Sequence, residues 1–305
     1  MPQVGILLDQ SAYNMPPAEL AAAAKRIEAL GFESAWLLDG FSRDPFVAAS
    51  FILQNTTTLK VGTGIATVYS RDAMAAQQAR ETLSHYYPGR FLMGLGASNE
   101  FIVQMRGGVW TPPVPKMTQY LEAMAGTQLA HPAPAELAPL HIAAHAPGLQ
   151  KLAMKHCKGI ITWILPVESV RKARENMGEG LEITANFPCV VNDNLEEARK
   201  VARAFLAFYL GIDYYQRAYS AIGFEPSDFE NGGSDRLIDA IVPSGSPEKI
   251  KQRVDEYATA GATRVVLNPI REKTAAQDSG LDHVDREWQA DADLESLDRL
   301  APVLL

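Results

Sequence analysis

Short apolar runs with the character of buried strands alternate with helix-like segments along the whole chain of 305 residues. Parallel strands need crossover helices between them, so an unbroken alternation over this length favours a (β/α)8 barrel. A doubly wound open sheet, with or without a second domain, is the alternative fold. The predicted strands are residues 4–8, 34–38, 61–66, 91–95, 140–144, 159–164, 183–190 and 264–267.

The domain organisation follows from the same alternation. No low-complexity linker divides the chain, so we expect a single TIM-barrel domain over residues 1–305. Two irregular stretches, about 98–116 and 212–246, follow the fourth and seventh strands and are expected to be insertions. Loops at this end of a barrel build the active site. Residues 288–304 are expected to form a C-terminal helix over the barrel.

Composition excludes several classes of protein. A net charge of -8 argues against a nucleic-acid-binding protein, which usually has a basic face. Two cysteines form neither a disulfide framework nor a metal-binding spacing, and are expected to be core thiols in a reducing compartment. The N-terminus lacks the features of a signal peptide, and no apolar run is long enough to span a membrane. We therefore expect a cytoplasmic protein with no nucleic-acid or membrane partner.

Glycine pairs stand at the ends of two predicted strands, in residues 62–64 and 94–96. Glycine at such a position allows an unusual backbone conformation or the close approach of a ligand. The ends of parallel strands are also where barrels and open sheets bind flat ligands. Neither pair completes a dinucleotide-binding fingerprint, because Thr67 and Asn99 stand where the third glycine is needed.

Two histidines are candidates for a site, but not for a shared metal. His141 and His145 are four residues apart along one predicted strand, where that spacing spans roughly 13 Å. We therefore predict no metal site. His141 is expected to be a core or barrel-end histidine. His145, at the strand end, is expected to face a pocket. Metalloprotease, P-loop and serine-hydrolase motifs are absent.

Two acidic residues are further candidates. Asp39 ends the second strand, where it is either a ligand-binding or catalytic group or the cap of a turn. Glu100 follows the second glycine pair and either reaches the same pocket or is a solvated loop charge. A set of aromatic residues has helical spacing and is expected mainly in the core, with a substrate pocket or a subunit interface as alternatives. This set comprises Phe205, Phe208, Tyr209, Tyr214, Tyr215 and Tyr219.

From residue 4 to about 269 the chain resembles the luciferase-like (bacterial luciferase superfamily) oxidoreductases. Within them it is most similar to the branch that uses coenzyme F420, an 8-hydroxy-5-deazaflavin. The resemblance rests on the order and spacing of five segments, residues 61–66, 88–98, 139–144, 232–240 and 245–250.

The resemblance implies a barrel with the cofactor ring over the C-terminal ends of the strands. It also implies a non-prolyl cis peptide at Gly64-Ile65 that backs the ring. Two departures stand out: Gly40 follows the acid, where the family often has histidine, and His145 lies in a turn that commonly reads Ala-Leu-Gly-Pro. The implied cofactor-binding residues are Asp39, Gly64, Ile65, Ala66, Gly96, Ala97, Ser98, His145, Ala146, Pro147 and Gly148.

The implied function is hydride transfer between reduced F420 and a small organic substrate with a carbonyl, an imine or a conjugated alkene. The cofactor supplies the reactivity, and the protein supplies position and electrostatics. Candidate residues to polarise the substrate or move a proton are Asp39, His145 and Glu100, in that order. An FMN-dependent monooxygenase or reductase is the first alternative, and a non-catalytic barrel relative is the second. We also expect a homo-oligomer, most simply a homodimer.

Overall fold

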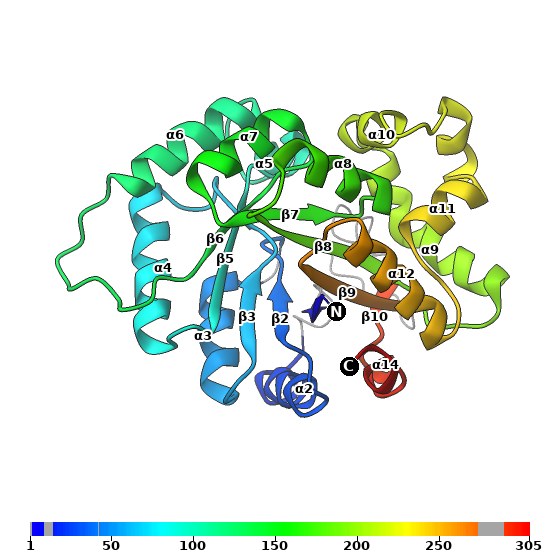
Figure 1. The fold of residues 1–305 in the computed structure, drawn as a ribbon, viewed down its shortest axis with the longest axis horizontal. Coiled ribbons are helices and arrows are strands. Elements are labelled where there is room, and N and C mark those ends of the chain that lie inside the picture. Colours follow the sequence, from blue (N-terminus) through cyan, green and yellow to red (C-terminus); the bar gives the residue numbers. More distant parts are fainter. Residues whose placement is uncertain (1, 9–14, 42, 274–289) are drawn as a thin grey trace.

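The computed structural model describes residues 2–8, 15–41, 43–273 and 290–305, and it contains a closed parallel barrel (Figure 1). The barrel strands pair in parallel in the order β1-β2-β3-β5-β6-β7-β8-β9, with β4 also paired to β5, and β1 pairs with β9 to close the barrel. The predicted (β/α)8 fold is confirmed, and the open-sheet alternative is wrong. The strands are β1 Gln3–Leu8, β2 Ser34–Leu37, β3 Lys60–Thr63, β4 Ala66–Thr67, β5 Phe91–Gly96, β6 Leu140–Ala143, β7 Gly159–Trp163, β8 Glu182–Cys189 and β9 Arg264–Glu272.

The third barrel strand is interrupted. β3 and β4 both pair with β5, and they are separated by Gly64 and Ile65. The strand predicted over residues 61–66 is therefore two short strands joined by a bulge, because the backbone leaves the regular ladder at these two residues.

Helices cover the outside of the barrel between successive strands (Figure 1). Several begin with an aspartate cap: the Asp44 side chain accepts hydrogen bonds from the N–H groups of Phe46 and Val47, and that of Asp72 accepts from Ala75. In the described part of the chain, no helix is long and apolar enough to cross a membrane. The outer helices are α2 Pro17–Ala29, α3 Pro45–Asn55, α4 Ala73–Tyr86, α6 Pro113–Ala125, α7 Pro147–His156, α8 Val167–Met177, α12 Pro247–Thr259 and α14 Leu297–Leu304.

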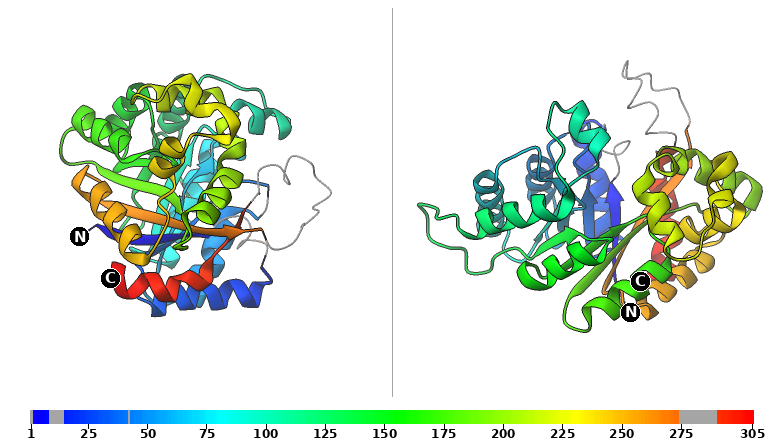
Figure 2. Two further views of the ribbon diagram at one scale, coloured as in Figure 1. Left: turned by 90° about the vertical axis from the view of Figure 1, so that its right-hand side faces the viewer. Right: turned by 90° about the horizontal axis from the view of Figure 1, so that it is seen from above.

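The two expected insertions are largely helical (Figure 2). The first contains α5 Glu100–Met105, which begins at the Asn99 cap, and α6 already begins at Pro113. The second contains α10 Asp213–Ser220, η1 Pro226–Gly232 and α11 Asp235–Ile241, which follow the long helix α9 Leu195–Leu210. These helices share a second hydrophobic cluster with residues at the ends of β7 and β8. The Tyr219 hydroxyl fixes this cluster to the barrel by donating to the Ile164 carbonyl at 2.9 Å.

The C-terminal segment differs from the expected helix over residues 288–304. Residues 288 and 289 lie outside the described residues, and β10 Ala290–Ala292 pairs antiparallel with the end of β9. Helix α14 begins only at Leu297. The prediction was wrong for β10 because its pairing with β9 is a tertiary contact that local sequence does not encode.

The middle of the barrel is filled by the indole of Trp36, which is fully buried. Glycines on the neighbouring strands make room for it: a Cβ at Gly62 would lie 2.6 Å from the ring, and one at Gly5 would lie 3.0 Å from its Nε1. The indole N–H donates to Ser34 Oγ at 2.8 Å. Other apolar side chains complete this layer, namely Leu7, Leu92, Ile161 and Val266.

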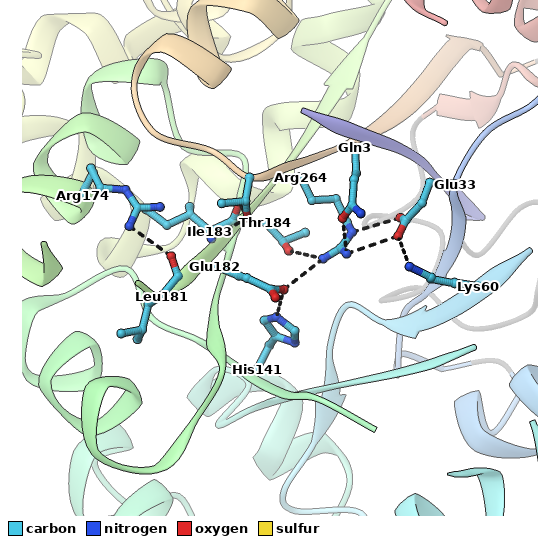
Figure 3. A network of polar contacts seen from close by, with 11 residues as sticks. Gln3, Glu33, Lys60, His141, Arg174, Leu181, Glu182, Ile183, Thr184 and Arg264 are labelled. Carbon is cyan, nitrogen blue, oxygen red and sulfur yellow. Dashed lines mark hydrogen bonds and ion pairs between the residues drawn. The ribbon is translucent and has the colours of Figure 1, made fainter. Parts of the chain in front are cut away.

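A polar network closes the barrel at the N-terminal ends of its strands (Figure 3). Arg264, only 4% exposed, donates from Nε to Glu33 Oε2 at 3.1 Å and from Nη2 to Gln3 Oε1 at 2.6 Å. Glu182 forms an ion pair with Arg264, with Oε2 3.6 Å from Nη1, and its Oε2 also lies 3.0 Å from His141 Nε2. We call these five residues the bottom network. His141 is fully buried at the barrel end, as predicted.

The bottom network holds its carboxylates in the charged form. Burial alone would raise the pKa of Glu33, but the Arg264 guanidinium outweighs it and the net pKa is lowered. The hydrogen bond from His141 is the main cause of the lowered pKa of Glu182. Carboxylates with lowered pKa values stabilise the fold above their unfolded pKa, and this stability is lost as the pH falls through the folded values.

We predict that Arg264→Met lowers the free energy of unfolding at pH 7 by about 3 kcal/mol, because it leaves buried carboxylates without their cation. The deficit relative to the wild type shrinks as the pH falls below about 4, where the carboxylates become protonated in both states. Urea unfolding at pH 7, 5 and 3.5 measures both effects.

Lys200→Met is the matched control, because it removes a cation whose ion pair with Glu272 is exposed. Exposed ion pairs contribute little to stability, so this variant is expected to unfold like the wild type. Equal losses in the two variants would contradict the role given to the bottom network.

Candidate functional site

The C-terminal ends of β2, β4, β5 and β6 bring the predicted cofactor-binding segments to one face of the barrel, which we call the mouth. Asp39 follows β2, Gly96 ends β5, and His145 follows β6. The Gly64-Ile65 peptide bond is cis, as predicted from the family resemblance. The four segments predicted from sequence therefore lie at the same end of the barrel.

The bulge at Gly64 and Ile65 is held by backbone and side-chain contacts. Gly64 N–H donates to Leu37 O at 2.7 Å, and Asp39 N–H donates to Ile65 O at 3.0 Å. A Cβ at Gly96 would lie 2.8 Å from the Ile65 side chain and 3.2 Å from Ala143 Cβ. Glycine is therefore needed at position 96 so that Ile65 can pack across the strand end.

Asp39 is the centre of a hydrogen-bond cluster. Its side chain is 5% exposed, and its Oδ2 accepts from Thr67 N–H at 3.0 Å and from the Ser70 hydroxyl at 2.9 Å. Its Oδ1 accepts from Arg106 Nη1 at 3.1 Å, and this guanidinium also donates to Gly40 O. Asp39 therefore caps the turn after β4 and fixes Arg106 at the mouth.

His145 is a partly buried, neutral imidazole whose Nδ1 is shielded from solvent. Burial lowers its pKa to about 4. Nε2 accepts from Trp163 N–H at 3.2 Å, so the proton of the neutral ring belongs on Nδ1. Nδ1 is buried and has no hydrogen-bond partner in the described part of the chain. Tyr214 stacks on the ring, with a centroid separation of 5.5 Å.

Glu100 occupies the first turn of α5. It is exposed, and its carboxylate accepts a hydrogen bond from Gln104, one turn further along the helix. Arg106, which immediately follows α5, is the residue whose side chain reaches Asp39.

The start of α7 presents one backbone donor at the mouth. The helix begins at Pro147, which has no N–H, and its cap residue Ala146 makes no side-chain cap. The N–H groups of Leu149 and Gln150 donate to Ala146 O, so the donor left in the first turn is the N–H of Gly148. Unpaired N–H groups at a helix start favour an anion. Ala146, Pro147 and Gly148 are exposed. An anionic group could therefore approach this helix from solvent.

Two asparagines in the barrel interior are further candidates that the sequence patterns do not predict. Asn186 on β8 and Asn268 on β9 are each 1% exposed. The side-chain nitrogen and oxygen of both have no hydrogen-bond partner among the described residues. The available signal was a lone asparagine in each of two otherwise largely apolar strands.

The aromatic set on α9 and α10 lies between core and mouth. Phe205 and Tyr209 contact Trp163 at the end of β7, with centroid separations of 6.2 and 6.1 Å. Tyr214 and Tyr215 contact His145. The set therefore belongs mainly to the second hydrophobic cluster, as expected, and two of its tyrosines also contact the His145 ring. No group of residues suited to hold a metal ion occurs in the described ranges.

Comparisons with known proteins agree with this geometry. The family model described as luciferase-like monooxygenase matches residues 3–264. A 5,10-methylenetetrahydromethanopterin reductase of Methanolobus tindarius is 22% identical over 304 residues, covering 85% of this chain and 93% of the relative.

Two solved structures share the fold. An F420-dependent secondary alcohol dehydrogenase in complex with an F420-acetone adduct has a TM-score of 0.73 and 16% identity, with 100% of this chain and 99% of that chain covered. The coenzyme F420-dependent tetrahydromethanopterin reductase from Methanopyrus kandleri has a TM-score of 0.69 and 17% identity, with the same coverage. With a family model that spans most of the chain, these findings show that the protein belongs to the luciferase-like monooxygenase family.

Proposed function

We propose that this protein is an F420-dependent oxidoreductase. It transfers a hydride between the reduced deazaflavin and a small organic substrate that has a carbonyl, an imine or a conjugated alkene. The observation that carries the proposal is a set of buried hydrogen-bonding groups without partners, His145 Nδ1 and the amides of Asn186 and Asn268. Buried polar groups are normally paired, so these groups indicate a polar ligand in this part of the barrel. The two solved structures named for F420 dependence favour the deazaflavin.

The residues at the mouth fit such a cofactor. The planar ring would lie against the bulge formed by Gly64, Ile65 and Ala66 and against residues 96–98. The start of α7 would receive the anionic tail, because the helix has no side-chain cap there and its N-terminal end and the Gly148 N–H favour an anion. When bound, reduced F420 supplies a hydride and reacts poorly with oxygen.

The protein side chains position the substrate and polarise it. His145 Nδ1–H would donate to a substrate oxygen or nitrogen at the mouth. Since the pKa of this imidazole is about 4, it remains a neutral donor throughout the physiological range. Asp39 would hold Arg106 against the turn that borders the ring. Glu100, at the exposed start of α5, is the remaining candidate for proton transfer with solvent.

An FMN-dependent monooxygenase is the second candidate, because the matching family is described as luciferase-like monooxygenase. Fluorescence titration with F420 and with FMN separates the two. We predict that F420 binds at least tenfold more tightly, and that turnover with reduced F420 does not depend on oxygen. Tighter FMN binding with oxygen-dependent turnover would favour the second candidate.

We predict that Gly96→Val weakens F420 binding by tenfold or more. The new side chain would collide with Ile65, 2.8 Å from the position of its Cβ, and push that side chain out of the surface proposed to back the ring. Gly126→Val is the control, because a Cβ at this position, just beyond α6, would have its nearest neighbour at 3.5 Å. Fluorescence titration measures affinity, and circular dichroism reports folding. If a folded Gly96→Val protein binds F420 normally, the ring lies elsewhere.

We predict that His145→Phe retains F420 affinity but lowers kcat/KM by 10- to 100-fold, roughly the loss expected for one positioned donor. Phenylalanine preserves the stacking on Tyr214 and removes both the Nδ1–H group and the Nε2 acceptor of the Trp163 N–H. The readout is the steady-state rate with a substrate found in a carbonyl and alkene screen. An unchanged kcat/KM would exclude His145 from the reaction.

A second readout of His145 needs no substrate. Its pKa is lowered from 6.5 to about 4, so the unfolded state binds a proton more readily between these values. Wild-type stability therefore falls as the pH drops from about 6.5 towards 4. Urea unfolding of His145→Phe is expected to show a smaller fall over the same range.

A further inference from the structure

Asn186 and Asn268 lie on neighbouring strands of the barrel wall. In the β8–β9 register Asn186 pairs with Val266 and Pro188 pairs with Asn268. Val266 belongs to the interior layer around Trp36. Side chains alternate between the two faces of a strand, so Asn268 points inward like Val266, two residues nearer the mouth.

Asn186 reaches the bulge. A Cβ at Gly64 would lie 3.1 Å from Asn186 Nδ2 and 3.1 Å from the Trp36 ring. The amide therefore lies at the edge of the indole layer, next to Gly64. It is placed between the packed interior and the mouth.

The two amides have four hydrogen-bonding atoms without partners in the described part of the chain. Leaving a buried amide unpaired costs free energy, of the order of 1–3 kcal/mol per group. Carboxamides carry no net charge, and an ionised ligand group buried against them alone would be strongly disfavoured. The group that they recognise is therefore neutral, and it has both acceptors and a donor.

We infer that Asn186 and Asn268 together bind one edge of a flavin or deazaflavin ring. This edge has two carbonyl groups with an imide N–H between them. Two carboxamides supply the two donors and the one acceptor that this edge needs. The choice of deazaflavin rests on the proposed function, but recognition of the edge does not, because flavins and deazaflavins share it.

The first test uses the wild-type protein and two tail-free rings, lumiflavin and its N3-methyl derivative. Methylation removes the imide donor and leaves both carbonyls. The wild type is expected to bind lumiflavin at least tenfold more tightly than the methylated ring, measured by fluorescence titration. Equal affinities would overturn the inference. This test does not depend on F420 or on turnover, so its failure is separate from failure of the proposed function.

The second test uses Asn186→Leu and Asn268→Leu, each studied separately. Leucine has a similar size and removes the buried polar atoms that lack partners. The melting temperature of the ligand-free protein should therefore stay level or rise by about 1–3 °C. Discrimination between the two rings should fall below threefold, and F420 affinity should fall at least tenfold. A lower melting temperature would assign the amides to fold stability and overturn the inference. Unchanged affinity for both rings would also overturn the inference, and would indicate that the amides bind the substrate instead.

Thr162→Val is the matched control. Thr162 is 2% exposed and its hydroxyl also has no partner among the described residues. It lies between Ile161 and Trp163, which contact the interior layer, so it points to the outer face of β7. This variant should share the small gain in melting temperature and bind both rings and F420 like the wild type.

Discussion

The packing of one indole organises the barrel from end to end. Trp36 fills the interior because Gly5 and Gly62 present no side chain to it. On one side the guanidinium of Arg264 lies 5.8 Å from the ring centroid. On the other side the ring contacts the position where Gly64 would bear a Cβ. A large rigid side chain in a close-packed interior leaves little freedom to its neighbours, so the height of the bulge depends on this layer.

The buried polar groups at the two ends of the barrel differ in whether they have hydrogen-bond or ionic partners. At the bottom, every carboxylate of the network has a cationic or histidine partner, and the lowered pKa values of Glu33 and Glu182 follow from that pairing. Near the mouth, Asn186 and Asn268 have no partners in the described part of the structure. The first arrangement stabilises a fold, while the second is suited to a ligand.

The strands of the fold could be predicted because a parallel barrel buries continuous apolar runs. Helix α5 lies within residues 98–116, which were expected to be an irregular insertion. The prolines at residues 112–115 indicated a loop, but proline is well tolerated in the first turn of a helix, and α6 begins at Pro113. At the site, Asp39 and His145 could be predicted because each follows the C-terminal end of a predicted strand. The partners of Asp39 could not be predicted, since Arg106 lies 67 residues away in sequence. Nor does local sequence show that Asn186 is left without a partner.

The indole layer also couples the two ends of the barrel. The guanidinium of Arg264 in the bottom network and the position of a Cβ at Gly64 in the bulge both lie against the Trp36 ring. Substitutions that share a packed neighbour are expected to deviate from additivity. A change at the mouth that displaces this ring would therefore also alter the ionic closure beneath it.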